Sequence, residues 1–429
     1  MATNAPPIQA NAVVTLWALA DFRRFWSADL VSKLGDGTTF LALPLTAIVA
    51  LESSPFEVGL IGVAQLASAI VFGLPAGALV DRLGRRRRTM IAADLGRAVS
   101  LATVPIAFAL GTLTIAQLLI VAATNAALAA CFDVASSAFV PRLVGRANLV
   151  DANAKLALGR SAAEVGGPAI AGVLIGLAGA PLAVLFDGAS FIVSALTLGR
   201  VSVDDREPPG DGTSTRSSLR ADIATGIRYV AHQPYIRAVV ATACVANLSR
   251  TVAFTALLIY AVRVAGLTPV EISVAFAVGN VGFFVGGLTA TALTRRLGVG
   301  RTMIGSVLCF GPGMTLVVAA PRELLVPSIT VMALLNGFGI ATHGVNQISL
   351  RQSVTPNRLL GRVSAVTRLV IMGALPLGAA LGGTLGSLVG LHATLVIGTL
   401  GLYAAVVPYL ASPVHRLVAM PEQVEEAAV

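Results

Sequence analysis

The chain has 429 residues, of which 56% are hydrophobic and only 12% are charged, about half of the roughly 25% usual in soluble proteins. This composition excludes soluble, disordered, collagen-like and disulfide-rich secreted chains, and it indicates a protein that crosses a membrane many times. The formal net charge is +9, and the three cysteines are scattered through apolar stretches, so neither a disulfide framework nor a metal cluster is implied.

Long runs without Asp, Glu, Lys or Arg locate the membrane spans. A helix needs about 20 apolar residues to cross about 30 Å of hydrocarbon, and short polar breaks divide the chain into segments of that size. Strands of a membrane barrel would alternate in segments of about ten residues, and that pattern is missing from the sequence. Twelve helical spans are therefore predicted, at about 25–50, 57–80, 89–110, 115–140, 154–177, 181–199, 236–261, 271–293, 302–320, 324–348, 363–388 and 392–411.

Arginines are concentrated in every second loop between these spans. The basic set includes Arg82, Arg85 to Arg88, Arg142, Arg146, Arg206, Arg216, Arg220, Arg295, Arg296, Arg301, Arg351, Arg358 and Arg362. The opposite loops contain only Arg263 and Arg322. Positive residues mark cytoplasmic loops, so we expect both termini in the cytoplasm of a plasma-membrane protein. The basic charge then faces anionic lipid headgroups and does not indicate a nucleic acid partner.

The same pattern divides the chain into five parts. We expect a cytoplasmic tail over 1–20, a six-helix bundle over 21–200, a cytoplasmic linker over 201–235, a second six-helix bundle over 236–412 and a second tail over 413–429. Small residues near position 20 do not make a signal peptide, since no positive charge precedes them. Within the linker, Leu219, Ile223, Ile227 and Val230 recur at helical spacing, which predicts an amphipathic helix on the membrane surface.

The two bundles resemble each other in sequence. Three short motifs recur in order at offsets between 208 and 215 residues: Asp81-Arg82-Leu83-Gly84 with Arg295-Arg296-Leu297-Gly298, Pro141-Arg142-Leu143 with Pro356-Asn357-Arg358-Leu359, and Gly167-Pro168-Ala169 with Pro376-Leu377-Gly378. An internal duplication into two parallel repeats is an architecture of secondary transporters. The predicted fold is an all-α membrane protein with twelve transmembrane helices in two pseudo-symmetric six-helix bundles.

The loop between spans two and three resembles the signature loop of the major facilitator superfamily. Gly77, Asp81, Arg82, Gly84, Arg85 and Arg86 match its pattern of Gly-x-x-x-Asp-Arg-x-Gly-Arg-Arg. Softer patterns, in Ser364–Gly383, around Pro141 and in Asp222–Pro234, are similar to the enterobactin-exporter and macrolide-efflux branch of proton-driven drug exporters.

Each part of this loop has a physical interpretation. Gly77 permits close helix approach, Gly84 supplies a tight turn, and Arg85 and Arg86 lie at the anionic leaflet. The resemblance implies that Asp81 latches against the start of span eleven. The alternative is a plain cytoplasmic loop with positive residues.

Span five resembles the antiporter signature of the family's exporters. Gly159, Gly167, Pro168 and Gly172 carry the likeness, whereas alanines at 163 and 171 replace two expected glycines. Pro168 is expected to kink the helix, and the small residues permit close packing between the halves. The alternative is ordinary small-residue packing without a role in antiport.

Charges inside the spans are the remaining signal, because each one costs several kcal/mol unless it is paired or faces water. Asp36 lies ten residues from Trp26, about 15 Å along a helix and so near the middle of the membrane. Lys33 can pair with Asp36, but Asp29 competes for the same ammonium group. Asp94 with Arg97 and Arg160 with Glu164 are spaced to neutralise each other.

Family resemblance implies that spans one, four, seven and ten line a central cavity. The candidates for proton coupling or substrate contact on these spans are Asp36, Asp133, Arg250, Asn346 and Gln347. The alternative for Asp36 is that it has no role in transport and only neutralises the charge of Lys33.

The predicted function is proton-coupled export, by alternating access, of a small apolar or amphiphilic molecule such as a drug or siderophore. No Walker loop and no hydrolase motif is found, so we expect neither ATP use nor enzymatic activity, and no cofactor or metal. The expected partners are a small-molecule substrate, protons and the lipid bilayer, and the expected state is a monomer. The alternatives are a uniporter or importer of a metabolite and, from another class, a non-transporting receptor or scaffold.

Overall fold

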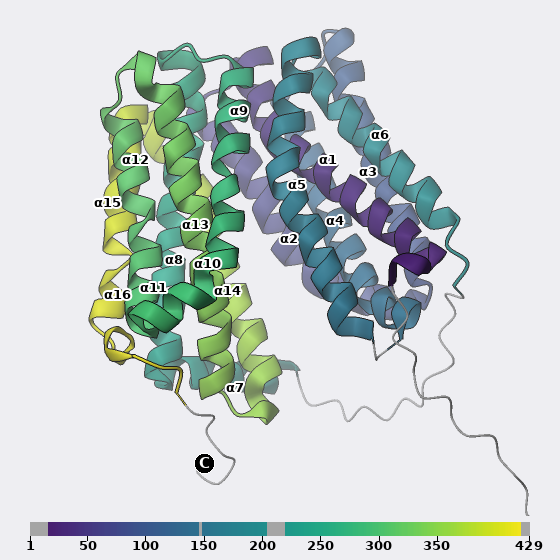
Figure 1. Ribbon diagram of the computed structural model, residues 1–429. Coiled ribbons are helices and arrows are strands. Elements are labelled where there is room, and N and C mark those ends of the chain that lie inside the picture. Colours follow the sequence, from purple (N-terminus) through teal and green to yellow (C-terminus); the bar gives the residue numbers. More distant parts are fainter. Residues whose placement is uncertain (1–15, 146–147, 204–218, 422–429) are drawn as a thin grey trace, which may run out of the picture.

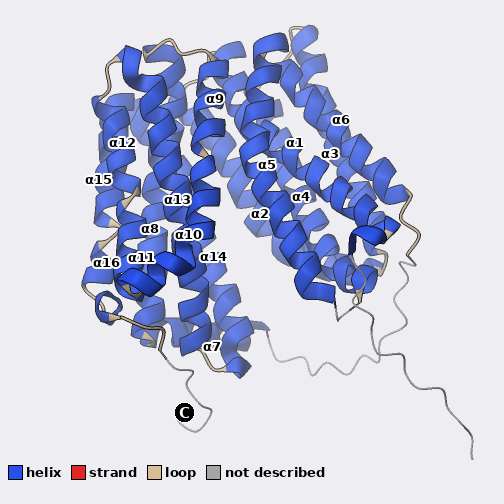
Figure 2. Ribbon diagram, in the orientation of Figure 1, coloured by secondary structure: helices blue, strands red, loops and turns tan. Residues whose placement is uncertain are grey.

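The computed structural model describes residues 16–145, 148–203 and 219–421, and all regular elements in these ranges are helices (Figure 2). Local sequence sets many of the helix ends. Ser54 and Thr268 each form a capping box with a glutamate three residues on, Glu57 and Glu271, which satisfies backbone N–H groups that a helix start leaves free. Gly84 ends one helix in the left-handed conformation at φ 57°, which glycine adopts without strain.

The first half of the chain forms six long helices that lie side by side (Figure 1). A short 3₁₀ turn, Leu16–Ala18, precedes them. The helices are α1 (Ala20–Ala50), α2 (Pro55–Leu83), α3 (Arg86–Ala109), α4 (Ile115–Val144), α5 (Leu149–Ala178) and α6 (Ala180–Gly199).

The second half also contains six spans, but several of them are interrupted. Its elements are α8 (Pro234–Ile259) with a π-helical turn Tyr260–Val264, α9 (Pro269–Gly279), α10 (Val281–Leu297), α11 (Val299–Leu308), α12 (Phe310–Ala319), α13 (Arg322–Val354), α14 (Asn357–Leu388), α15 (Leu391–Ala404), α16 (Val407–Leu410) and a 3₁₀ turn Pro413–Arg416. The predicted eighth, ninth and twelfth spans are thus each divided into two helices, at breaks that the hydropathy pattern did not indicate.

Eleven segments of the described chain are long and apolar enough to cross a membrane. The remaining predicted span, the first at 25–50, corresponds to α1, whose charged first half separates it from the other eleven by composition. Its 31 residues extend about 45 Å at the helical rise, which is enough to cross a bilayer. The twelve-helix prediction is confirmed, and the predicted span boundaries are correct to within a few residues.

The helices form two bundles that meet along α2 with α14 and α5 with α9. We call one end of the molecule the arginine-rich end; it carries the α2–α3 turn at Gly84, helix α7 and the segment 413–421. The opposite end carries the turn 51–54 and the turn 265–268. Figure 1 shows the bundles in contact toward the opposite end and diverging toward the arginine-rich end.

Hydrogen bonds join the two bundles at the opposite end of the molecule. Arg263 donates to the carbonyl of Ser53 at 2.6 Å, and the Phe56 N–H donates to Ser387 Oγ at 3.1 Å. Both contacts lie at the opposite end.

Helix α7 (Leu219–His232) forms where the amphipathic spacing predicted it. It packs on α14, where a Cβ on Gly226 would lie 3.1 Å from the Arg362 carbonyl, and Tyr229 donates to the Val354 carbonyl at 2.5 Å. Burial raises the pKa of the Tyr229 hydroxyl above its usual value, so it stays a donor at physiological pH. Ile223 and Ile227 remain exposed, as a helix lying on a lipid surface requires.

Candidate functional site

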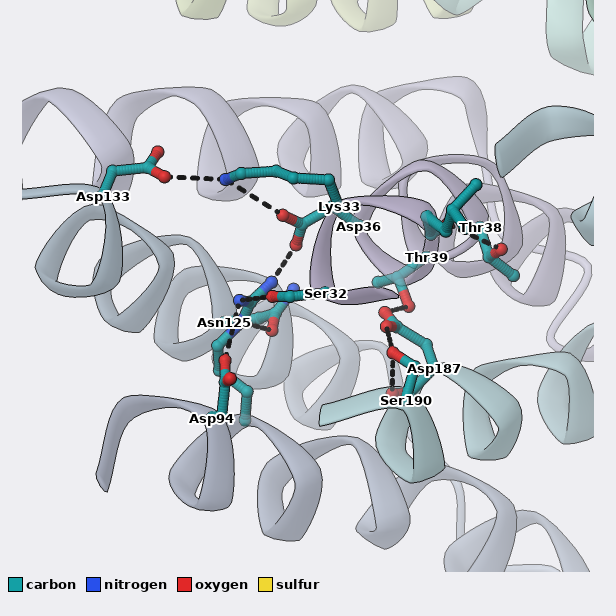
Figure 3. A network of polar contacts seen from close by, with 12 residues as sticks. Ser32, Lys33, Asp36, Thr38, Thr39, Asp94, Asn125, Asp133, Asp187 and Ser190 are labelled. Atoms are coloured by element: carbon teal, nitrogen blue, oxygen red, sulfur yellow. Dashed lines mark hydrogen bonds and ion pairs between the residues drawn. The ribbon is translucent and has the colours of Figure 1, made fainter. Parts of the chain in front are cut away.

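Lys33 joins two of the predicted carboxylates in the N-terminal bundle. Its Nζ lies 2.7 Å from Asp133 Oδ1 on α4 and 3.5 Å from Asp36 Oδ2, one helical turn away on α1 (Figure 3). The predicted competition from Asp29 is absent, because Asp29 Oδ1 is buried and has no hydrogen-bond partner among the described residues. Lys33 therefore pairs with Asp36, three residues later, and with Asp133 on α4, and not with Asp29, four residues earlier.

Arg97 on α3 continues the network into the protein interior. Its side chain is fully buried, and its Nη2 forms an ion pair with Asp36 Oδ1. The guanidinium also bonds Asn125 Oδ1 at 3.0 Å and Ser32 Oγ at 3.3 Å, and it contacts Asp94 Oδ1 at 3.5 Å. Its remaining face covers the Phe191 ring on α6 at 3.6 Å. A planar, permanently charged group with five donors suits this position, where a lysine could not satisfy as many partners.

The chain of ion pairs runs from an exposed side chain into the core. The exposed fraction of the side chain falls from 50% at Asp133 to 27% at Asp36 and 0% at Asp94. Asp94 Oδ2 has no hydrogen-bond partner among the described residues. Contacts therefore connect an exposed carboxylate to a fully enclosed one through alternating positive and negative groups.

Asp187 on α6 forms a separate polar centre beside this network. It accepts hydrogen bonds from Thr39 and, at 3.2 Å, from Ser190 Oγ (Figure 3). A Cβ on Gly35 would collide with the Asp187 carboxylate, so glycine at 35 gives this carboxylate its space. These contacts fit a packing role for the Asp187 carboxylate.

The candidates in the C-terminal bundle do not join the network. Arg250 on α8 contacts Asn247 Oδ1 at 3.4 Å and forms no ion pair with a described residue. Asn346 uses both ends of its amide within its own bundle, accepting from Thr294 at 2.9 Å and donating to the Thr342 carbonyl at 3.0 Å. Gln347 is half-buried on α13. Of the five cavity candidates, only Asp36 and Asp133 are brought together by described contacts.

The signature loop is a tight turn between α2 and α3. Gly84 has the expected left-handed conformation, and its N–H bonds the Val80 carbonyl at 3.1 Å. Arg86 donates to the Ala138 carbonyl on α4 at 3.1 Å. The close helix approach predicted for Gly77 is not found in this conformation, since a Cβ there would meet no described atom within 4 Å.

Arg82 and Arg85 are exposed at the same turn. The side chain of Asp81 lies outside the described part of the structure, so the latch stays a prediction.

The span-five glycines place α5 against both bundles. A Cβ on Gly159 would lie 3.4 Å from the Trp26 indole Nε1, which donates to the Lys155 carbonyl, and a Cβ on Gly167 would lie 2.8 Å from the Gly37 Cα. On the other face, a Cβ on Gly172 would lie 2.7 Å from Ser273 Cβ of the second bundle. These approaches support the packing interpretation and also locate the motif at the interface between the halves.

Sequence reasoning treated Arg97 as the local partner of Asp94 and left out Ser32 and Asn125. The available signals were weak: Asn125 is one of two side-chain amides in an uncharged run, and Ser32 adjoins Lys33. Arg160 and Glu164, also expected to neutralise each other, form no ion pair among the described residues. Helical spacing shows which groups can meet, but a closer partner on another helix decides which ones do.

Comparison with known proteins agrees with this architecture. The model of the Major Facilitator Superfamily matches residues 25–374. The multidrug efflux pump Tap of Mycolicibacterium fortuitum is 28% identical over 396 residues, which cover 89% of this chain and 94% of that protein. The pump of the same name from Mycobacterium tuberculosis is 28% identical over 378 residues, which cover 86% of this chain and 87% of that protein.

Solved structures share the fold at low sequence identity. The nucleoside transporter NupG superposes with a TM-score of 0.71 at 11% identity, covering 93% of this chain and 98% of that one. A bacterial homologue of the iron transporter ferroportin in its inward-facing state gives 0.68 at 16% identity, covering 94% and 99%. The family match spans most of the chain, and the twelve helices in two bundles agree with it. The protein is thus a membrane transporter, not an enzyme, and it belongs to the Major Facilitator Superfamily.

Proposed function

We propose that the protein exports small apolar or amphiphilic molecules across the cell membrane in exchange for protons, by alternating access. The relatives named as multidrug efflux pumps support export. The arginine asymmetry supports a cytoplasmic location for the arginine-rich end and for both termini. The conformation described here, closed at the opposite end, is then the one that faces the cytoplasm.

The observation that carries proton coupling is the position of Lys33 between Asp36 and Asp133. A single ammonium group holds two carboxylates from different helices, and Arg97 holds Asp36 from the other side. In this arrangement both carboxylates are charged and stabilised by their cations. A proton on either one would remove an ion pair and release that end of the bridge.

This exchange couples protons to substrate in the direction of export. In the state that faces the cytoplasm, the charged carboxylates and Lys33 form the closed network, and the proton has been released. A substrate that binds beside the network favours the change of state. Facing outward, a proton taken up by Asp36 or Asp133 breaks the bridge, and the substrate leaves. A ligand can drive this cycle only through a difference in its affinity for the two states.

Efflux in everted membrane vesicles tests the proposal. With the lumen acidified, vesicles should accumulate an amphiphilic dye such as ethidium. Asp36→Asn should lower pH-driven accumulation at least tenfold while leaving the protein inserted, because Lys33 still holds Asp133. Asp151→Asn is the matched control: this exposed aspartate of the same bundle pairs with Lys155 and should retain transport.

Three results would contradict the proposal. Full pH-driven accumulation by both Asp36→Asn and Asp133→Asn would remove the coupling role of this network. Dye movement only down its own gradient, unaffected by pH, would indicate a uniporter. Failure to transport any of a broad set of amphiphiles would favour a receptor or scaffold.

A further inference from the structure

The proline in span five leaves one backbone carbonyl of α5 without its usual partner. In an α-helix each N–H bonds the carbonyl four residues earlier, and Pro168 has no N–H. Helix α5 continues through Pro168, so the carbonyl of Glu164 lacks its intrahelical donor. An unsatisfied backbone group within a membrane is costly, and transmembrane prolines persist where neighbouring helices supply a partner.

The other bundle supplies that partner. Asn280 Nδ2 lies 2.7 Å from the Glu164 carbonyl oxygen. The contact fixes the orientation of the amide, because a carbonyl accepts only from the NH₂ end. A residue 116 positions away in sequence thus completes the backbone of α5 at the point where Pro168 interrupts it.

Asn280 is held firmly on its own side. It lies at the break between α9 and α10, where the Phe283 N–H bonds the Asn280 carbonyl at 3.0 Å. The flanking Gly279 and Gly282 are buried against α13, where a Cβ on either would collide with Ala333 or with the Leu334 carbonyl. The break therefore directs the amide out of a rigid helix pair toward α5.

The contact lies deep in the membrane, at the edge of the closed interface. Asn280 is 11 residues from the start of α9 at Pro269, about 16 Å along the helix. It lies farther from the opposite end than the Arg263–Ser53 and Phe56–Ser387 contacts do.

We propose that Asn280 is a positioning residue for transport: its bond to the carbonyl freed by Pro168 favours the conformation closed at the opposite end. When the bundles separate at this depth, the Asn280 amide moves away from the Glu164 carbonyl and the bond is lost. The bond therefore contributes to one state only, and such a differential contact is what shifts a two-state equilibrium. The inference rests on the proposed function only through the existence of two states.

A double-mutant cycle between positions 168 and 280 tests this directly. Asn280→Ala removes the donor, whereas Pro168→Ala restores an N–H that can bond the Glu164 carbonyl within α5. If the two residues act through that carbonyl, the Asn280 change should matter only while Pro168 is present.

The readout is the distance between spin labels at the opposite end, measured on the full-length protein in nanodiscs. Labels at Thr112, in the first bundle, and Glu323, in the second, replace exposed side chains in a background without Cys131, Cys244 and Cys309. Asn280→Ala should raise the ratio of the separated to the closed population about five- to tenfold, the effect of losing one hydrogen bond between the bundles. In the Pro168→Ala background the same change should alter the ratio less than about twofold.

An equal shift in both backgrounds, or no shift in either, would overturn the proposal. If Pro168→Ala does not insert, side-chain chemistry at 280 decides: Asn280→Ser keeps a donor and should remain within about twofold of wild type, whereas Asn280→Val keeps the size and should behave like alanine. Equal populations for serine and valine would then contradict the proposal. Because no substrate or proton gradient is used, this result is independent of the efflux assay, and either proposal can fail alone.

Discussion

Arg97 is the residue on which the N-terminal network depends. It is fully buried yet contacts two carboxylates, an amide, a hydroxyl and an aromatic ring. Buried charges are stable only when paired and hydrogen-bonded. Removing one partner of such a group is far more damaging than the net stability of the pair suggests, because the other partner stays behind uncompensated.

Replacing Arg97 with Gln should lower the stability of the protein by about 3–5 kcal/mol, since Asp36 and Asp94 lose their shared cation. Adding Asp94→Asn should restore part of the loss, because one of the abandoned charges is then removed. Thermal unfolding of the purified protein in detergent measures both effects. Arg160→Gln serves as the control; this exposed arginine should change stability by no more than about 0.5 kcal/mol. Equal losses at positions 97 and 160 would contradict the network's structural importance.

Helix α10 shows how glycine position decides the packing of an element. Gly282 and Gly286 of α10, like Gly279 at the end of α9, face α13 so closely that a Cβ on any of them would collide with it, whereas Gly287 faces open space. Without a hydrophobic effect between helices in lipid, close packing through small residues is a main source of association. The same packing fixes the break that positions Asn280.

Gly282→Ala should therefore disrupt the α10–α13 pair and destabilise the protein by about 1–3 kcal/mol, the usual cost of overpacking. Gly287→Ala adds the same methyl group to the same helix where space is free, so it should be neutral or slightly stabilising. Comparing the melting temperatures of the two variants separates packing from helix propensity. Similar melting temperatures would show that α10 can shift away from α13 without loss.

The two ends of the transporter differ in their content of arginine and in the contacts between the two bundles. The arginine-rich end carries the signature turn and α7, and the bundles diverge toward it (Figure 1). The opposite end is closed by Arg263 with Ser53 and by the Phe56 N–H with Ser387. Orientation in the membrane then decides which solution reaches Lys33 and Asp133.

Cysteine labelling in intact cells should confirm that the arginine-rich end is cytoplasmic. In a cysteine-free background, Thr112→Cys, in the exposed α3–α4 turn, should react with an impermeant maleimide. Val418 lies in the segment 413–421 at the arginine-rich end, and its side chain is 81% exposed. Val418→Cys should therefore react only after the cells are permeabilised. If only Val418→Cys were labelled in intact cells, the proposed topology and the proposed direction of transport would both be wrong.

The membrane class, the twelve spans, the duplication, the signature turn at Gly84 and the amphipathic helix α7 could all be predicted from the amino-acid sequence. These features depend on hydropathy, helical period and backbone conformation, which are properties of neighbouring residues. The sequence also identified Asp36 and Asp133 as candidates, because charge within an apolar run is expensive wherever it occurs.

The pairing of the charged and polar side chains depends on tertiary packing and could not be predicted from the sequence. Lys33 bridges to α4 and leaves Asp29 aside, Arg97 reaches Asp36 on another helix, and Asn280 of the second bundle completes the backbone at Pro168. Helical spacing offers each charged or polar group several neighbours of similar distance. The choice among them depends on which helices pack together and where a glycine lets them approach, and that information is spread over residues far apart in the chain.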